Sequence, residues 1–132
     1  MQWTPQQTEA IQTRGCNLLV AAAAGAGKTS VLVERIITQL KDPAPAMDVD
    51  RLLVVTFTNA AAAQMREKIG RELENELKRN PASQHLRRQL NLLNCASIST
   101  LHSFCLEILR QHFYRLDLDP NFRVADDEEV SL

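Results

Sequence analysis

The stretch AAAAGAGKTS, residues 21–30, decides the fold, because it contains Gly27-Lys28-Thr29. These residues complete the pattern G-x-x-x-x-G-K-[ST], in which the backbone N–H groups of a glycine-rich loop surround the phosphates of a nucleotide. The first position of the pattern is Ala22 instead of glycine. Two explanations are open: a phosphate loop with one substitution, or the start of an alanine-rich helix.

The neighbouring segments favour the phosphate loop. NLLVAA, residues 17–22, is an apolar run without polar alternation, which predicts a strand buried on both faces. SVLVERIITQL, residues 30–40, has the spacing of an amphipathic helix. The motif requires this order of strand, loop and helix. The helix alternative would place Gly25 and Gly27 inside a helix, at a cost of about 1 kcal/mol each.

Each part of the loop has a chemical role. Gly25 and Gly27 have no Cβ, so the chain can adopt positive φ and approach a phosphate closely. The helix N-terminus adds roughly half a positive charge, and alanine suits any position with negative φ. Lys28 is expected to reach the β and γ phosphates, and the Thr29 hydroxyl to ligate Mg²⁺. The predicted nucleotide-binding residues are Ala22, Ala23, Ala24, Gly25, Ala26, Gly27, Lys28, Thr29 and Ser30, with Lys28 and Thr29 in catalytic roles.

The rest of the chain alternates between strands and helices. RLLVVTFT (51–58) predicts a second buried strand, and CASIS (95–99) a short third one. Asn59 is expected to cap a helix with an apolar stripe from Met65 to Leu77. Further helices are predicted around 86–93 and from 101 to 113. We therefore predict an α/β fold in which helices flank a parallel sheet.

Composition places the chain among ordinary globular domains. Apolar residues make up 45% and charged residues 23% of 132 residues, enough for one modest domain. No apolar run reaches the roughly 18 residues of a membrane span, and the N-terminus lacks the layout of a signal peptide, so the cytoplasm is the expected compartment. The three cysteines lack C-x-x-C spacing and are expected to be structural thiols in a reducing compartment. We predict no metal held by protein ligands alone.

The net charge of -1 conceals an asymmetry along the chain. Residues 117–132 carry six acids and one arginine, whereas the first 116 residues carry 14 basic and 10 acidic side chains. The body of the chain is therefore mildly basic, which permits a polyanionic partner.

Three other segments resemble motifs of superfamily 1 helicases. WTPQQTEAI (3–11) is similar to the Gln motif, in which a glutamine, here Gln7, binds adenine through its amide. Taken alone, this segment leaves a second interpretation open, a polar cap at the start of an N-terminal helix. VVTFTNAAAAQM (54–65) and STLHSFC (99–105) resemble motifs Ia and Ib. These three segments and the phosphate loop are four motifs, and they stand in the same order as in the family. The resemblance to UvrD/Rep-like members implies a RecA-like P-loop fold that uses ATP and Mg²⁺.

The resemblance also implies a surface for single-stranded DNA, formed by motifs Ia and Ib at the carboxyl ends of strands. Phe57 would stack on a base, which is worth about 1–3 kcal/mol. The residues expected to bind phosphates are Thr58, Asn59, Thr100, His102 and Ser103. Two alternatives stay open: Phe57 in the core, and His102 as an ordinary first-turn residue. Ala60 stands where many relatives have lysine, which removes one phosphate contact.

Within the family, KTSVLVERI and STLHSFCLEILRQHFYRLDLDPNFRVADDEE resemble the subunits of bacterial helicase–nucleases that act with a second subunit. The resemblance implies an ATP-driven motor that moves 3′-to-5′ on single-stranded DNA, opens duplex ends for break repair and recombination, and has no membrane partner. We expect the chain to be the beginning of a longer protein. Residues 1–116 would form the N-terminal part of motor domain 1A, and residues 117–132 an acidic segment leading into the next subdomain.

The consecutive acids Asp126-Asp127-Glu128-Glu129 follow no apolar strand, so we interpret them as a helix start and not as the carboxylate pair that hydrolysis requires. The chain is therefore expected to bind Mg-ATP but to hydrolyse it negligibly. Three alternatives remain open: a Rep/UvrD-type repair helicase without a nuclease, a P-loop nucleotide kinase, and a non-catalytic nucleotide-binding module.

Overall fold

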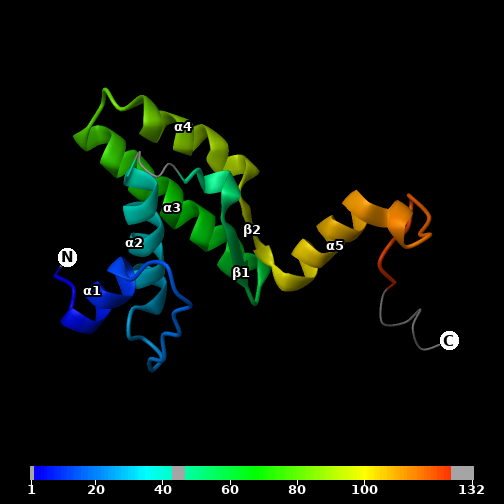
Figure 1. Cartoon of the computed structure of the whole chain (residues 1–132), viewed down its shortest axis with the longest axis horizontal. Coiled ribbons are helices and arrows are strands. Elements are labelled where there is room, and N and C mark those ends of the chain that lie inside the picture. The colour runs from blue at the N-terminus through cyan, green and yellow to red at the C-terminus, as the bar shows by residue number, and fades with distance from the viewer. Residues whose placement is uncertain (1, 43–46, 126–132) are drawn as a thin grey trace. The chain divides into compact units, whose positions relative to one another are not determined.

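The computed structural model describes residues 2–42 and 47–125, and the chain divides into two compact units, Met1–Thr100 and Leu101–Leu132. The first contains α1 (Pro5–Gln12), α2 (Lys28–Lys41), η1 (Val49–Arg51), β1 (Leu53–Thr56), α3 (Asn59–Arg79), α4 (Gln84–Leu92), η2 (Leu93–Cys95) and β2 (Ser97–Thr100) (Figure 1). The second contains α5 (Leu101–His112) and the short 3-10 helix η3 (Phe113–Arg115).

The sheet of the first unit is parallel, as predicted. β1 and β2 pair in the register Leu53↔Ser97 to Thr56↔Thr100. β1 lies inside the predicted segment 51–58, and β2 overlaps the predicted segment 95–99 and ends one residue after it. The prediction that β1 is a buried strand is wrong for one of its faces, because Leu53 and Val55 are exposed there. Helices flank this small sheet, so the α/β class is confirmed for the described part of the chain.

The predicted strand at residues 17–22 is wrong. This segment has no strand structure, and Leu19 is 93% exposed. The apolar run is compatible with a buried strand, but a strand also needs a partner for its backbone hydrogen bonds. In the described residues, the sheet consists of β1 and β2 alone, so residues 17–22 have no strand beside them. The local sequence predicts an apolar strand, but it does not determine which other strand would pair with it.

Helix α3 organises the core of the first unit. It contacts α2, α4 and both strands, and Ile69 and Leu73 on its buried face are completely inaccessible to solvent. Leu40 of α2 is equally buried, and Val54 and Ile98 contribute the inner face of the sheet. The predicted stripe at four-residue spacing is therefore the face that α3 packs inward. A smaller cluster of Ala10, Ile11 and Val31, with Trp3 against it, joins α1 to α2.

The cap of α3 is Thr58 and not Asn59, which corrects the sequence prediction. The Thr58 backbone is extended, and its hydroxyl accepts a hydrogen bond from the Ala61 N–H at 3.1 Å. Asn59 is the first helical residue. Both residue types cap well, so the choice depends on where β1 ends, and a local pattern does not fix that point.

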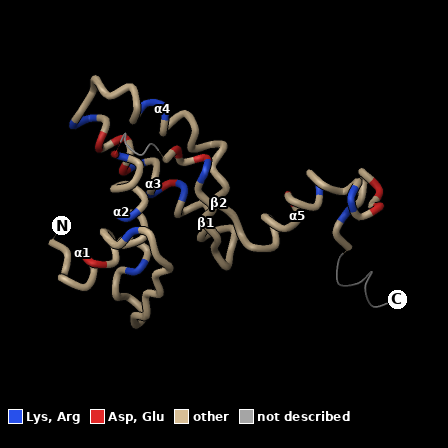
Figure 2. Tube along the Cα trace, viewed as in Figure 1, with Lys and Arg blue, Asp and Glu red and all other residues tan. Residues whose placement is uncertain are grey.

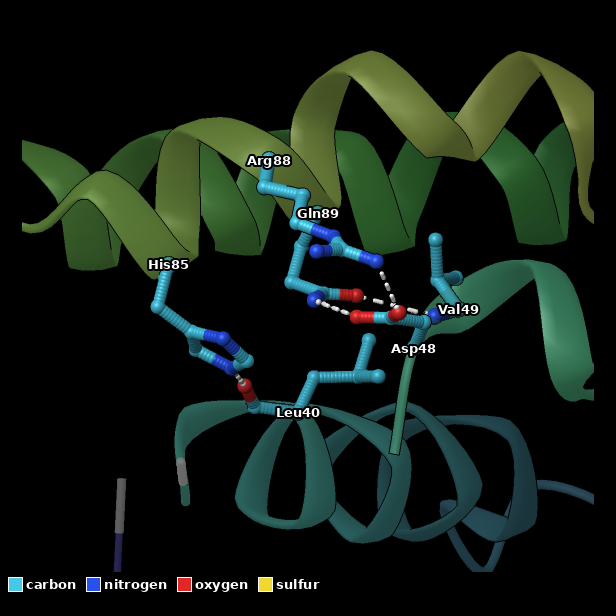
Figure 3. A network of polar contacts seen from close by, with 6 residues as sticks. All are labelled: Leu40, Asp48, Val49, His85, Arg88 and Gln89. Atoms are coloured by element: carbon cyan, nitrogen blue, oxygen red, sulfur yellow. Dashed lines mark hydrogen bonds and ion pairs between the residues drawn. The ribbon is translucent and has the colours of Figure 1, made fainter. Parts of the chain in front are cut away.

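A buried amide holds the segment that enters β1 (Figure 3). Gln89 of α4 is fully buried; its Oε1 accepts from the Val49 N–H at 2.8 Å, and its Nε2 donates to Asp48 Oδ1 at 2.7 Å. Arg88 pairs with the other carboxylate oxygen of Asp48 at 2.7 Å. The Gln89 hydrogen bond, helped by the Arg88 charge, lowers the pKa of Asp48. The network thus satisfies polar groups at the base of β1.

The end of α2 is attached to the neighbouring helices as well. His85 Nε2 of α4 lies 2.6 Å from the Leu40 carbonyl oxygen, as Figure 3 also shows. Lys41 Nζ lies 3.1 Å from the carboxylate of Glu76 on α3. The last carbonyls of a helix have no partner inside it, so the imidazole satisfies one of them. The helix that begins at Lys28 is therefore fixed at its far end.

The second unit contains the predicted helix after residue 100, observed as Leu101–His112, and it buries none of its own side chains completely. The acidic run 126–129 lies outside the described residues. No helix in the described part of the chain is long and apolar enough to cross a membrane. All three cysteines are free and exposed.

Candidate nucleotide and nucleic-acid sites

The loop before α2 has the backbone shape that its glycines allow. Gly25 and Gly27 have φ of 79° and 81°, and Gly27 is the N-cap residue of α2. Asp117 is the one non-glycine residue with positive φ in the described ranges, so Ala22 does not need a glycine's backbone freedom. The substitution at the first position of the motif is thus compatible with the observed loop.

Lys28 folds back over this loop. Its Nζ donates to the carbonyl oxygens of Ala22 at 2.6 Å and of Ala23 at 2.8 Å. The Ala26 N–H donates to the Ala23 carbonyl at 3.3 Å, which closes the turn. The ammonium group therefore lies against the loop, on the exposed side of the segment. Neutral carbonyls are weaker partners for an ammonium than an anion is, so a phosphate would compete well for it.

Gln7 lies beside the same loop although 19 positions separate it from Ala26 in the sequence. The Gln7 Oε1 accepts from the Thr4 N–H at 3.0 Å, and the Thr4 hydroxyl accepts from the Gln7 N–H at 3.2 Å, forming a capping box. Its Nε2 donates to the Ala26 carbonyl at 3.4 Å. Gln7 is therefore the capping-box partner of Thr4, and its amide reaches the loop before α2.

Two arginines outside the predicted site contact the C-terminal end of α1, and one of them, Arg35 of α2, joins α1 to α2. Arg35 of α2 donates to the Ala10 carbonyl at 2.6 Å, and Arg14 donates to the carbonyls of Ile11 and Thr13. Burial lowers the pKa of Arg14, and the charge of Arg35 lowers it further. A basic residue just after a helix is a signal that points to Arg14. No local pattern points to Arg35, whose partner lies 25 positions away.

Charge around the loop favours an anion. Residues 10–33 include Arg14 and Lys28 but no aspartate or glutamate. Figure 2 shows this part of the trace without acidic residues. With the N-terminus of α2 at the same place, the local field attracts negative charge.

The end of β1 carries the predicted DNA-contacting residues of the first unit. Phe57 is fully exposed, so the alternative that placed it in the core is wrong. Thr58 caps α3 and Asn59 opens it, which brings both beside a helix N-terminus. Thr100 lies at the end of β2, opposite Thr56 in the register, and is 9% exposed. The parallel register thus brings the ends of the two strands together.

His102 and Ser103 belong to the second unit, where both are exposed in the first turn of α5.

The strand ends share one electrostatic feature with the loop, because residues 51–66 and 77–106 contain no aspartate or glutamate. No carboxylate of these segments would therefore repel a polyanion. No group of three or more His, Cys, Asp or Glu side chains in the described residues has the arrangement of a metal site.

Known proteins similar to this chain match it over nearly its full length. Residues 3–132 match the family model of the UvrD/REP helicase N-terminal domain. An ATP-dependent helicase/nuclease subunit of Desulforamulus reducens is 65% identical over 130 residues, which are 98% of this chain and 10% of that protein. The proteins of the same name from Geobacillus thermodenitrificans and Clostridium novyi are 62% and 58% identical over 130 and 132 residues, or 98% and 100% of this chain and 10% and 11% of theirs.

The chain spans about a tenth of the length of the curated relatives it matches. The family match and the relatives confirm the resemblance that the four motifs indicated. By these findings the chain belongs to the UvrD/REP helicase family, and its residues 3–132 match the N-terminal domain of that family.

Proposed function

We propose that this chain is the ATP-binding part of an AddA-type subunit of a DNA helicase/nuclease, with the RecA-like P-loop fold of motor domain 1A. One observation carries the proposal: the Lys28 ammonium lies on a loop with two positive-φ glycines at the N-terminus of α2. Family membership supports it and favours a helicase over a nucleotide kinase or a non-catalytic module.

The residues of the loop fit ATP with Mg²⁺. The N–H groups of residues 22–30 would surround the phosphates, and Lys28 would exchange the carbonyls of Ala22 and Ala23 for phosphate oxygens. The Thr29 hydroxyl would ligate Mg²⁺, which neutralises phosphate charge when it is bound. Gln7 would present its amide to adenine, exchanging the long Nε2 hydrogen bond to Ala26 for a base contact.

We infer that the carboxylates needed for hydrolysis come from parts of the whole protein outside this chain. Hydrolysis requires one carboxylate on the metal and another group that positions water. Residues 10–33 offer no carboxylate beside the loop. By this proposal the chain binds Mg-ATP and turns it over negligibly by itself.

Single-stranded DNA is the proposed polymer substrate. Phe57 is fully exposed at the end of β1, where a base can stack on it, and Thr58, Asn59 and Thr100 lie at the paired strand ends. His102 and Ser103 would add phosphate contacts from α5. The whole protein would move 3′-to-5′ from duplex ends in break repair and recombination, together with an AddB-like partner.

The DNA assignment is tested by the single-strand dependence of ATP hydrolysis in the whole protein. Phe57→Ala is expected to raise the DNA concentration for half-maximal stimulation roughly 5- to 150-fold, which corresponds to the loss of about 1–3 kcal/mol of stacking. Val55→Ala, a change at a half-exposed residue of β1, is the matched control. Equal DNA dependence in both variants and the unmodified protein would contradict the proposed role of this surface.

A further inference from the structure

Arg66, near the start of α3, contacts the segment that leads into β2. Its Nη1 donates to the Leu93 carbonyl, and its Nη2 donates to the carbonyls of Ala96 at 3.0 Å and Ile98 at 3.3 Å. One guanidinium thus holds carbonyls in η2, in the connection after it, and in β2 itself. These partners lie 27 to 32 positions away in the sequence.

The three residues whose carbonyls Arg66 contacts are buried. Leu93, Ala96 and Ile98 are 8%, 4% and 5% exposed. The Ala96 carbonyl also accepts from the Ile98 N–H at 2.9 Å, so it uses two donors. Leaving a buried carbonyl without a donor costs about 1–3 kcal/mol. Arginine suits this place because its planar group carries five donors in a fixed fork and stays charged.

The contact matters for the register of the sheet. A β-hairpin turn fixes register in antiparallel pairs, whereas β1 and β2 are parallel and α3, α4 and η2 lie between them in the chain. Helix α3 follows β1 directly through its cap Thr58. A bond from α3 to Ile98, two residues before Thr100, therefore ties β2 to the end of β1.

We propose that Arg66 is a positioning residue for single-stranded DNA binding, because it fixes β2 against α3 and sets the Thr100 end of β2 beside Phe57 and Thr58. The DNA consequence rests on the proposed function. The clamp itself does not, so the two are tested by different measurements. The side chain needs no contact with DNA or nucleotide to act in this way.

The clamp is tested by hydrogen exchange in the whole protein. Arg66→Met removes the donors and keeps much of the side-chain length, so amides in 96–100 should exchange roughly tenfold faster while those of α2 stay unchanged. Arg71→Met is the matched control, because Arg71 also lies on α3 but pairs with Glu67 at the surface. Unchanged exchange in 96–100 would overturn the proposal.

The consequence for DNA is tested by single-strand affinity alongside the KM for ATP. Arg66→Met should weaken DNA binding roughly tenfold with the KM for ATP within about twofold of the unmodified protein. Arg66→Lys, which keeps the charge but not the fork, should fall between the two. A parallel loss of DNA and ATP binding in both variants would overturn the proposal, because it would show a general role in stability.

Phe57→Ala separates the two possible failures. Weakened DNA binding in Phe57→Ala, with full affinity in Arg66→Met, would overturn the positioning role and leave the proposed function intact. Full affinity in both variants would contradict the proposed DNA surface and with it the positioning role, and the exchange experiment would still decide whether Arg66 fixes β2.

Discussion

The predicted phosphate loop and the paired strand ends both place polar groups at a helix N-terminus, but they are held in different ways. The loop is exposed and depends on two glycines, the Lys28 ammonium and the amide of Gln7. The strand ends depend on distant contacts: the parallel register, the buried face of α3 and the Arg66 guanidinium. Apart from the Gln7 contact, the loop is therefore specified by adjacent residues, and the strand ends by the packing of the first unit. Substitutions in the two regions should differ in what they disturb.

Removing the loop ammonium is the largest expected functional change. Lys28→Ala should lower ATP-driven unwinding by the whole protein at least about a hundredfold, the scale of losing one preorganised charge. Stability should change by less than about 0.5 kcal/mol, because Lys28 lies at the surface of the loop. Lys41→Ala, which removes a lysine from the other end of α2, is the control for unwinding. Full unwinding by Lys28→Ala would show that unwinding does not depend on the Lys28 ammonium, and it would contradict the proposed role of the loop.

Truncating the core should have the opposite profile. Ile69→Ala is expected to lower the free energy of unfolding by about 2–5 kcal/mol, because Ile69 is completely buried in α3. Denaturant titration would measure this, with Val55→Ala at a half-exposed position as the control. A cost below about 1 kcal/mol would show that α3 does not organise the core.

Removing the buried amide tests the support beneath β1. Gln89→Ala deprives the buried Val49 N–H of its acceptor, so it should destabilise the fold by about 1–3 kcal/mol. Gln111→Ala, at an exposed residue of α5, should be nearly neutral in the same thermal or denaturant unfolding experiment. Equal unfolding midpoints for the two variants would count against the network in Figure 3.

Substitutions at Gly27 and Ala22 test which of the two positions in the loop requires a positive φ. Gly27→Ala places a Cβ at φ 81°, which should cost about 1–2 kcal/mol and lower ATP affinity. Ala22→Gly restores the usual motif, but it should leave affinity within about twofold because Ala22 needs no positive φ. Fluorescent nucleotide titration measures both variants. A large gain in affinity for Ala22→Gly would mean that the alanine distorts the loop.

The smallest expected effect is a pH dependence in acid. The folded pKa of Asp48 lies below its usual value of about 4, chiefly because Gln89 donates to the carboxylate. The carboxylate therefore stabilises the fold above the usual pKa, and this contribution is lost as pH falls through the lowered value. Asp48→Asn should reduce stability more at about pH 6 than at about pH 3. A pH-independent difference between the two proteins would contradict the assignment.

Much of the fold was predictable because patterns of adjacent residues determine its helices and strands. The amphipathic stripes predicted α2 and α3, the apolar runs predicted β1 and β2, and the parallel sheet followed from their alternation. The prediction of a strand at residues 17–22 was wrong because a strand needs a second strand to pair with, and an apolar run alone does not show whether that partner is present. The cap moved from Asn59 to Thr58 because β1 ends earlier than its apolar run suggested.

The residues of the candidate sites also differ in whether a local sequence pattern could predict them. Gly25, Gly27 and Lys28 were predicted from one short motif; the structure shows positive φ at both glycines and Lys28 on the carbonyls of the loop, and nucleotide binding by these residues stays a prediction. Arg35 and Arg66 were not found, because each acts on carbonyls at least 25 positions away. Their roles depend on tertiary geometry, which no spacing in the sequence encodes.

The measurement that tests the central claim most directly is a calorimetric titration of Mg-ATP into the protein, with Lys28→Ala and Ala22→Gly beside it. A functional loop predicts saturable binding at one site, lost in Lys28→Ala and retained in Ala22→Gly. Circular dichroism of each sample would establish that it is folded. A folded protein that binds no Mg-ATP, or binds it equally well without the Lys28 ammonium, would contradict the account.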